Sequence, residues 1–239
     1  LIDGYTQLGA SPNTALTGHN GRLLIELDGS LVGKASSLDL QGGDCIVRGL
    51  VINRFGASAG LFDDVAAIRI SWSGGNRIQG NFIGTDATGL LDRSNYFTAI
   101  RINGSSNVVI GGTAPAERNV ISGTKFKESG GLIRLGVGIL FANNTDGARV
   151  EGNVIGTAAD GVTPLGNEGY GIGYDGGFAA TNVVIGGTLP GSGNVIAFNG
   201  LLWLANNTFF GGGIQNPGNL VHSPILGNSI YSNLGLGIE

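Results

Sequence analysis

The chain has 239 residues, a net charge of −4, only 13 Lys and Arg together, and 46 glycines. So few cations argue against a nucleic-acid groove, which needs clustered positive charge, and no apolar run reaches the roughly 18–20 residues that cross a membrane. Hydrophobic residues make up 41 %, enough to bury a core, so the glycines are more typical of turns than of a disordered linker.

Residues 1–36 differ from the rest of the chain. No phrase in 1–21 recurs later, and only 22–27, Arg-Leu-Leu-Ile-Glu-Leu, has the pattern of a strand. The ends of a solenoid need covering, because an exposed strand edge pairs with other chains. We therefore predict that 1–36 is a cap segment at the N-terminal end of the core.

Residues 37–239 repeat a unit of three short apolar runs. The runs are three to five residues long, rich in β-branched residues and bounded by Gly or Asn, which is typical of short strands and not of helices. A small residue followed by isoleucine recurs 24 to 42 residues apart, at Ile68, Ile100, Ile139, Ile172, Ile214 and Ile238.

One seven-residue phrase, Asn-Val-Val-Ile-Gly-Gly-Thr, occurs at 107–113 and again at 182–188. Self-similarity on this scale indicates stacked units that are each too small to bury their own apolar face. Three strands per unit predict an all-β fold, a right-handed single-stranded parallel β-helix of about seven rungs that forms one domain over 1–239. Ile110 and Ile185 should then point inward.

Glycine and asparagine should occupy the corners of this solenoid. Gly111 and Gly186 follow the inward isoleucines, at a place where a positive φ is cheap only for Gly or Asn. A second recurring position is asparagine in four units, and amides stacked there can bond from rung to rung. These residues are Asn119, Asn153, Asn194 and Asn228.

The last residues, Gly237-Ile238-Glu239, begin another unit. We expect that the chain is a segment of a longer protein, or that this end, 237–239, associates with another molecule. A second copy of the chain is one such partner, and repeated pairing would give an end-to-end filament.

Several phrases resemble the right-handed β-helix repeats of large secreted bacterial proteins in the pectate-lyase-like superfamily. They are Gly-Asn-Phe-Ile-Gly-Thr-Asp-Ala-Thr-Gly at 80–89, the seven-residue phrase above, and Asn-Val-Ile-Ser-Gly at 119–123. The opening residues 2–14 also look like the first segment of such domains. The resemblance implies a secreted or cell-surface location and a polysaccharide or cell-surface glycan as partner. The superfamily includes polysaccharide lyases, hydrolases and non-catalytic modules, so the fold does not choose among them.

The repeat is interrupted after the third strand of each unit, in 85–97, 124–137, 157–170 and 198–212, which should emerge along one corner. Function concentrates in such loops. Aromatic faces stack on sugar C–H groups while amides bond hydroxyls, so we predict a ligand-binding set in these loops: Tyr96, Tyr170, Trp203, Asn206 and Asn207. The alternative is that the apolar members cover the side of the solenoid.

Two of these loops carry Asp86 and Asp160 at nearly equivalent places. Carboxylate and carbonyl oxygens are the ligands of Ca²⁺, so a calcium site is one interpretation. Each loop has few carboxylates, however, and aspartate is also a common turn former. No cofactor is required by the sequence.

Arg69 and Arg101 occupy outward positions one rung apart in two Ile-Arg-Ile triplets, and Asp63 and Asp64 lie just upstream. In polysaccharide lyases of this fold a cationic base works beside acidic residues that hold Ca²⁺ and neutralise a uronate. The resemblance therefore makes these four residues the catalytic candidates. The alternative is a pair of arginines on a solvated sheet face.

The repeat, the low charge and the incomplete catalytic set favour a non-catalytic extracellular β-helix module of a bacterial surface or secreted protein. Its role would be structural or adhesive, with contacts to carbohydrate. One alternative is a polysaccharide lyase or glycosidase acting on an acidic polysaccharide, and the other is the filament subunit.

Overall fold

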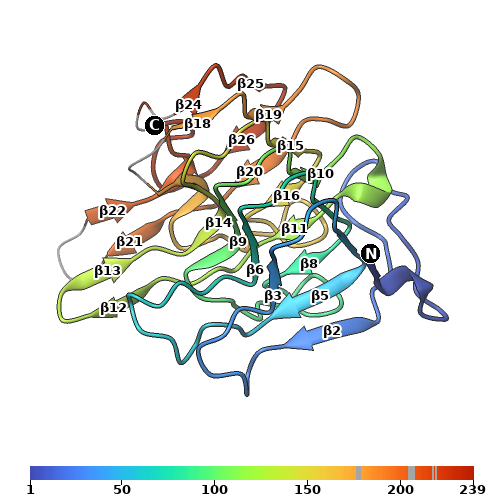
Figure 1. Cartoon of the computed structure of the whole chain (residues 1–239), viewed down its shortest axis with the longest axis horizontal. Coiled ribbons are helices and arrows are strands. Elements are labelled where there is room, and N and C mark those ends of the chain that lie inside the picture. The colour runs from blue at the N-terminus through green and yellow to red at the C-terminus, as the bar shows by residue number, and fades with distance from the viewer. Residues whose placement is uncertain (176–178, 204–207, 217, 219) are drawn as a thin grey trace.

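The computed structural model describes residues 1–175, 179–203, 208–216, 218 and 220–239, with only the backbone of 202 and 203. Its strands form three long parallel sheets, and the chain winds from one end of the stack to the other (Figure 1). Within the described residues two sheets have seven strands and one has six. The predicted all-β, three-sided parallel β-helix of about seven rungs is confirmed.

Each sheet takes one strand from each successive rung. The first sheet contains β1 (Ile2–Asp3), β4 (Ile46–Arg48), β7 (Arg77–Gln79), β10 (Val109–Gly111), β15 (Arg149–Glu151), β19 (Val184–Gly186) and β25 (Ile225–Leu226). The second contains β2 (Ile25–Asp28), β5 (Leu50–Asn53), β8 (Phe82–Ile83), β11 (Val120–Ile121), β16 (Val154–Ile155), β20 (Val195–Ala197) and β26 (Ser229–Tyr231). The third contains β3 (Leu38–Leu40), β6 (Ile68–Ser71), β9 (Thr98–Asn103), β14 (Val137–Ala142), β17 (Tyr170–Tyr174) and β23 (Gly212–Ile214).

The remaining elements are short and lie between these strands. Two antiparallel hairpins, on the left in Figure 1, connect the second sheet to the third, as do the other two interrupting loops. They are β12 (Lys127–Ser129) with β13 (Leu132–Arg134), and β21 (Leu201–Trp203) with β22 (Thr208–Phe210). A small parallel pair joins β18 (Ala180–Thr181) to β24 (Leu220–Val221), and the 3-10 helices are η1 (Gly4–Thr6) and η2 (Pro115–Glu117).

The two copies of the seven-residue phrase lie in the same sheet, in β10 and β19. Ile110 is in register with Val150, which is in register with Ile185, and all three side chains are fully buried. Equivalent positions of the third sheet form another column of buried isoleucines: Ile68, Ile100, Ile139, Ile172 and Ile214. The phrase repeats because the same side of the solenoid has the same packing requirement in different rungs.

Gly111 and Gly186 end these two strands with φ values of +82° and +80°. A Cβ atom at Gly111 would lie 2.0 Å from the carbonyl oxygen of Glu151 in the next rung, and one at Gly186 would lie 2.0 Å from that of Leu226. The corner is therefore reserved for glycine by both the left-handed backbone and the close approach of the next rung.

The predicted asparagine corner is confirmed and extends one rung further, to Asn81. Each side-chain amide donates a hydrogen bond to the Oδ1 of the next asparagine, at 3.1 Å from Asn81 to Asn119 and 2.9 Å from Asn119 to Asn153. The series continues at 3.0 Å to Asn194 and 2.8 Å to Asn228. Because these amides also bond backbone carbonyls, the ladder satisfies the buried polar groups of the turn.

A second asparagine ladder, which was not predicted from the sequence, lies at the corner between the second and third sheets. Asn167 donates to Asn199 at 2.8 Å, and Asn199 donates to Asn233 at 3.0 Å. Asn167 and Asn199 occur within interrupting loops and Asn233 follows the last strand, so the three do not stand out as a repeat. They hold the corner from which the hairpins project.

The second sheet is apolar on its outer side as well as its inner side. Val51, Phe82 and Val120 occupy equivalent outward positions and are fully buried. Their cover is residues 5–24, here called the N-terminal strap. Its Leu23 belongs to the same buried cluster as these three residues, and its His19 ring meets the Phe82 ring edge-on with centroids 4.6 Å apart. The strap thus lies along the side of the solenoid, while β1 and β2 join the first and second sheets.

Candidate functional site

The outer side of the third sheet brings together three of the four catalytic candidates. Asp39, Arg69 and Arg101 face outward in register, followed by Leu140 and Gly173 in the next two rungs. Neighbouring strands lie about 4.8 Å apart, so the two guanidinium groups are close enough to share a counter-ion. That counter-ion is Asp64, from the loop before β6.

Each of these arginines is held by two carboxylates. Arg69 contacts Asp39 at 2.6 Å and Asp64 at 3.3 Å, and Arg101 contacts Asp64 at 3.3 Å and Asp175 at 2.7 Å. The hydrogen bond that Arg69 donates to Asp39, together with the charge of Asp39, holds the pKa of Arg69 above its usual value. Arg69 therefore holds its proton more tightly than a free arginine, whereas a catalytic base must be present in its neutral form near neutral pH.

The carboxylate of Asp63 has different partners from that of Asp64. Its carboxylate accepts a hydrogen bond from the Gly60 N–H at 2.6 Å and contacts Lys34 at 3.3 Å, and these two interactions lower its pKa. Arg134, from β13, donates to the Asp63 carbonyl oxygen at 2.6 Å. The Asp63 carboxylate thus pairs with Lys34, whereas the Asp64 carboxylate pairs with Arg69 and Arg101. Among the described residues these two carboxylates belong to no cluster of metal-ligating side chains.

A cavity of about 260 Å³ adjoins this network on the third sheet. Arg101, Arg134, Asp175 and Gln215 contribute polar groups, and Tyr170 forms part of the wall. The Tyr170 hydroxyl donates to the Glu239 carboxylate, and burial, followed by Glu239, raises the Tyr170 pKa. The cavity is slightly smaller than the roughly 300–1,000 Å³ of most small-molecule sites.

Of the other predicted ligand-binding residues, Tyr96 is not part of the lining of this cavity. Tyr96 packs against a separate apolar cluster around Val65 and Phe97, and Lys127 Nζ lies 5.8 Å from its ring centroid. The backbone of Trp203 belongs to β21, but its side chain lies outside the described residues, as do Asn206 and Asn207.

Asp86 and Asp160 close their own loops. Asp86 accepts hydrogen bonds from the Thr88 hydroxyl at 2.7 Å and the Leu91 N–H at 3.1 Å, and Asp160 accepts from the N–H groups of Val162 at 2.9 Å and Thr163 at 2.8 Å. Burial opposes ionisation of both, yet these bonds lower both pKa values. The part of the chain that the structure describes contains no cluster of three or more metal-ligating side chains.

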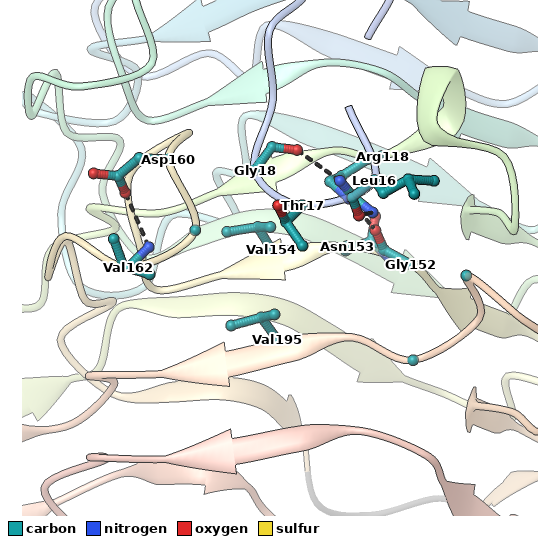
Figure 2. A pocket seen from close by; sticks show the side chains of 13 residues that line it. Leu16, Thr17, Gly18, Arg118, Gly152, Asn153, Val154, Asp160, Val162 and Val195 are labelled. Atoms are coloured by element: carbon teal, nitrogen blue, oxygen red, sulfur yellow. Dashed lines mark hydrogen bonds between the residues drawn. The ribbon is translucent and has the colours of Figure 1, made fainter. Parts of the chain in front are cut away.

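A hollow of about 610 Å³ lies on the second sheet beside residues 16–18 of the N-terminal strap (Figure 2). Val154 and Val195 form its floor, with Leu16 on one side and the loop of Asp160 on the other. Asp160 faces its own loop, and its bond to Val162 is drawn in Figure 2. The two charged residues of the lining, Arg118 and Asp160, are thus bonded to the backbone of the strap and of the Asp160 loop.

Arg118 fastens the strap to the solenoid and was not predicted. It donates to the carbonyl oxygens of Gly18 at 2.6 Å, Leu16 at 2.9 Å and, on the solenoid, Gly152 at 3.1 Å (Figure 2). Burial lowers its pKa, and no carboxylate forms an ion pair with it in the described ranges. A lone arginine in a corner loop has no sequence pattern that distinguishes it from a solvated one.

We expect His19 to make the strap sensitive to acid. Burial beside Phe82, and then the charge of Arg118, lower the pKa of His19 from 6.5 to about 4. Between these values only the unfolded chain takes up a proton, so the free energy of unfolding should fall as the pH drops from about 6.5 to about 4. The loss from this group is at most about 3 kcal/mol, and none occurs above that range. Urea denaturation at pH 7 and at pH 4.5 measures it.

Two variants distinguish the effect of His19 on stability from that of carboxylates that titrate in the same pH range. In His19→Asn the amide oxygen can still accept the Gly21 N–H, which His19 Nδ1 accepts at 3.2 Å, so the structure is kept and the titration is lost. This variant should lose less stability on acidification than the wild type. His222→Asn, at the exposed second histidine, should behave as the wild type. Equal acid sensitivity in all three proteins would contradict the assignment.

In comparisons with known proteins, the sequence matches no family model, and no curated protein is significantly similar. None of the helices in the described ranges is long and apolar enough to span a bilayer.

Proposed function

We propose that this chain is a non-catalytic extracellular β-helix module with a structural or adhesive role, and that the outer side of its third sheet contacts carbohydrate. The extracellular location rests on the resemblance of its repeated phrases to those of secreted bacterial proteins. The observation that carries the proposal is the mutual neutralisation of the charged residues on that side.

Charge pairing argues against the lyase alternative. A lyase needs a base that gives up its proton near neutral pH and carboxylates free to hold Ca²⁺ beside a uronate. Here Arg69 has a raised pKa, and Asp64 is shared by Arg69 and Arg101. A surface whose charges are already paired favours hydroxyl-bearing ligands, which bind through hydrogen bonds and apolar contact and need no counter-ion.

The dimensions of the outer side suit a polysaccharide. From Arg69 to Gly173 the sheet advances three rungs, about 14 Å at about 4.8 Å each, and the Tyr170 cavity lies at the far end. A chain of a few sugars fits this length. Several weak contacts along it would reinforce one another by raising the effective concentration of the next unit.

Retention of the protein on immobilised neutral and uronic polysaccharides tests the proposal. Parallel assays, with and without Ca²⁺, measure unsaturated product and new reducing ends. We expect binding without either product. Tyr170→Ala should reduce retention several-fold, whereas Tyr231→Ala, a partly exposed tyrosine on the second sheet, should not. Formation of unsaturated product that Arg101→Lys abolishes would assign lyase activity instead.

Self-association is the second candidate, because apolar side chains are exposed around the last rung. Leu234, Leu236 and Ile238 are 50 %, 66 % and 47 % exposed, and Ile238 pairs with Ile214 in the third sheet. Light scattering measures the molar mass of the wild type and of Leu236→Ser over a series of protein concentrations, and so tests for self-association. Growth of mass with concentration that the variant prevents would favour the filament role.

A further inference from the structure

Trp72 occupies a corner position that favours other residues. It follows β6 with a φ of +54°, and the register of Ser71 with Asn103 and of Asn103 with Ala142 makes Gly104 and Asn143 its equivalents in the next rungs. These have φ values of +58° and +46°. The corner therefore needs a left-handed backbone, which glycine and asparagine adopt readily and a bulky residue adopts only under strain.

Burial of the Trp72 side chain does not compensate for this strain. It is 69 % exposed, although tryptophan is highly buried on average. Its six-membered ring lies against the backbone of Gly104, since a Cβ there would be 2.3 Å from Cζ3 of Trp72. The ring is thus supported by the next rung and open to solvent elsewhere. Strained residues of this kind are concentrated at functional sites.

A hollow of about 410 Å³ lies beside the ring, lined also by Gln41, Arg69, Ser71 and Asn103. Gln41 Nε2 donates to Asp39, and Asn103 Oδ1 accepts from Asn143. Within the described residues, Gln41 Oε1, Ser71 Oγ and Asn103 Nδ2 have no hydrogen-bond partner. The hollow therefore offers an acceptor, a hydroxyl and a donor next to an aromatic ring.

We propose that Trp72, Gln41, Ser71 and Asn103 form a binding site for an uncharged pyranose unit of a polysaccharide. The proposal rests on the proposed function and names its ligand class. The C–H face of the sugar would cover the indole ring while its hydroxyls bond the three open polar groups. Arg69 is already paired with two carboxylates, so no free cation is present to select a uronate.

Calorimetric titration with neutral oligosaccharides (β-1,4-glucan, xylan, mannan and galactan) and with oligogalacturonate tests this site. We expect at least one neutral oligosaccharide to bind and Trp72→Asn to weaken it at least ten-fold. Thermal melting should show that Trp72→Asn is as stable as the wild type or more so, because asparagine occupies the equivalent corner at Asn143. Phe62→Asn, at another exposed aromatic residue, should leave affinity unchanged.

The outcomes separate this site from the wider function. Glycan binding that Trp72→Asn leaves intact overturns the site and keeps the function, whereas no binding by the wild type overturns both. Preference for oligogalacturonate overturns the ligand class. If the wild type is a dimer and Trp72→Asn is a monomer, the ring contacts a second copy of the chain. That result would also overturn the proposal.

Discussion

Asn153→Leu is expected to lower the free energy of unfolding by about 3–5 kcal/mol, one of the largest effects of any single substitution outside the isoleucine columns. Asn153 is 1 % exposed; its amide donates to the Ile110 carbonyl at 2.9 Å and to Asn194 at 3.0 Å, and its Oδ1 accepts from Asn119 at 2.9 Å. Leucine has a similar volume but leaves these buried partners unsatisfied. Guanidinium denaturation followed by circular dichroism measures the loss.

Asn228→Leu is the matched control, at the last position of the same ladder. Asn228 donates to the Ile185 carbonyl at 2.9 Å and accepts from Asn194 at 2.8 Å, but it is only half-buried. Water can replace its bonds, so the expected loss is about 1 kcal/mol. Similar losses at both positions would mean that the amide ladder contributes through something other than the satisfaction of buried groups.

Gly111→Ala is expected to cost about 4 kcal/mol. The methyl group would lie 2.0 Å from the Glu151 carbonyl oxygen and 2.5 Å from Asn153 Oδ1, so β10 and β15 would have to move apart. Strain at a φ of +82° adds about 1–2 kcal/mol, and overpacking typically adds about 1–3 kcal/mol. The same denaturation experiment gives the value.

Gly131→Ala isolates the contribution of the rung contact. Gly131 lies in the turn of the first hairpin with a nearly identical φ of +80°, and a Cβ there would meet nothing within 4 Å. Its substitution should cost only the backbone strain, about 1–2 kcal/mol. If Gly111→Ala cost no more than Gly131→Ala, the close approach of rungs would not be what reserves the corner for glycine.

The candidate site was predictable only in part. Arg69 and Arg101 were correctly placed one rung apart and facing outward, because side-chain direction in a strand follows from alternation with the inward isoleucines. Their partners Asp39 and Asp175 were not predicted, since they come from other rungs. Trp72 was missed because its left-handed backbone and exposure leave no trace in the repeat.

The sequence by itself determined the parallel β-helix, its inward isoleucine columns and its first asparagine corner. These features recur from rung to rung, so each appears several times in the sequence. The alternation of side chains along a short strand is then enough to predict them. Only the tertiary structure decided which outward residues are covered and which charges are paired. Val51, Phe82 and Val120 are buried because the N-terminal strap folds back over them. Arg101 is paired with Asp175, a residue that comes from two rungs further along the solenoid. Such contacts depend on the positions that the non-repeating loops adopt in the folded protein. Those positions cannot be predicted from the spacing of residues along the chain.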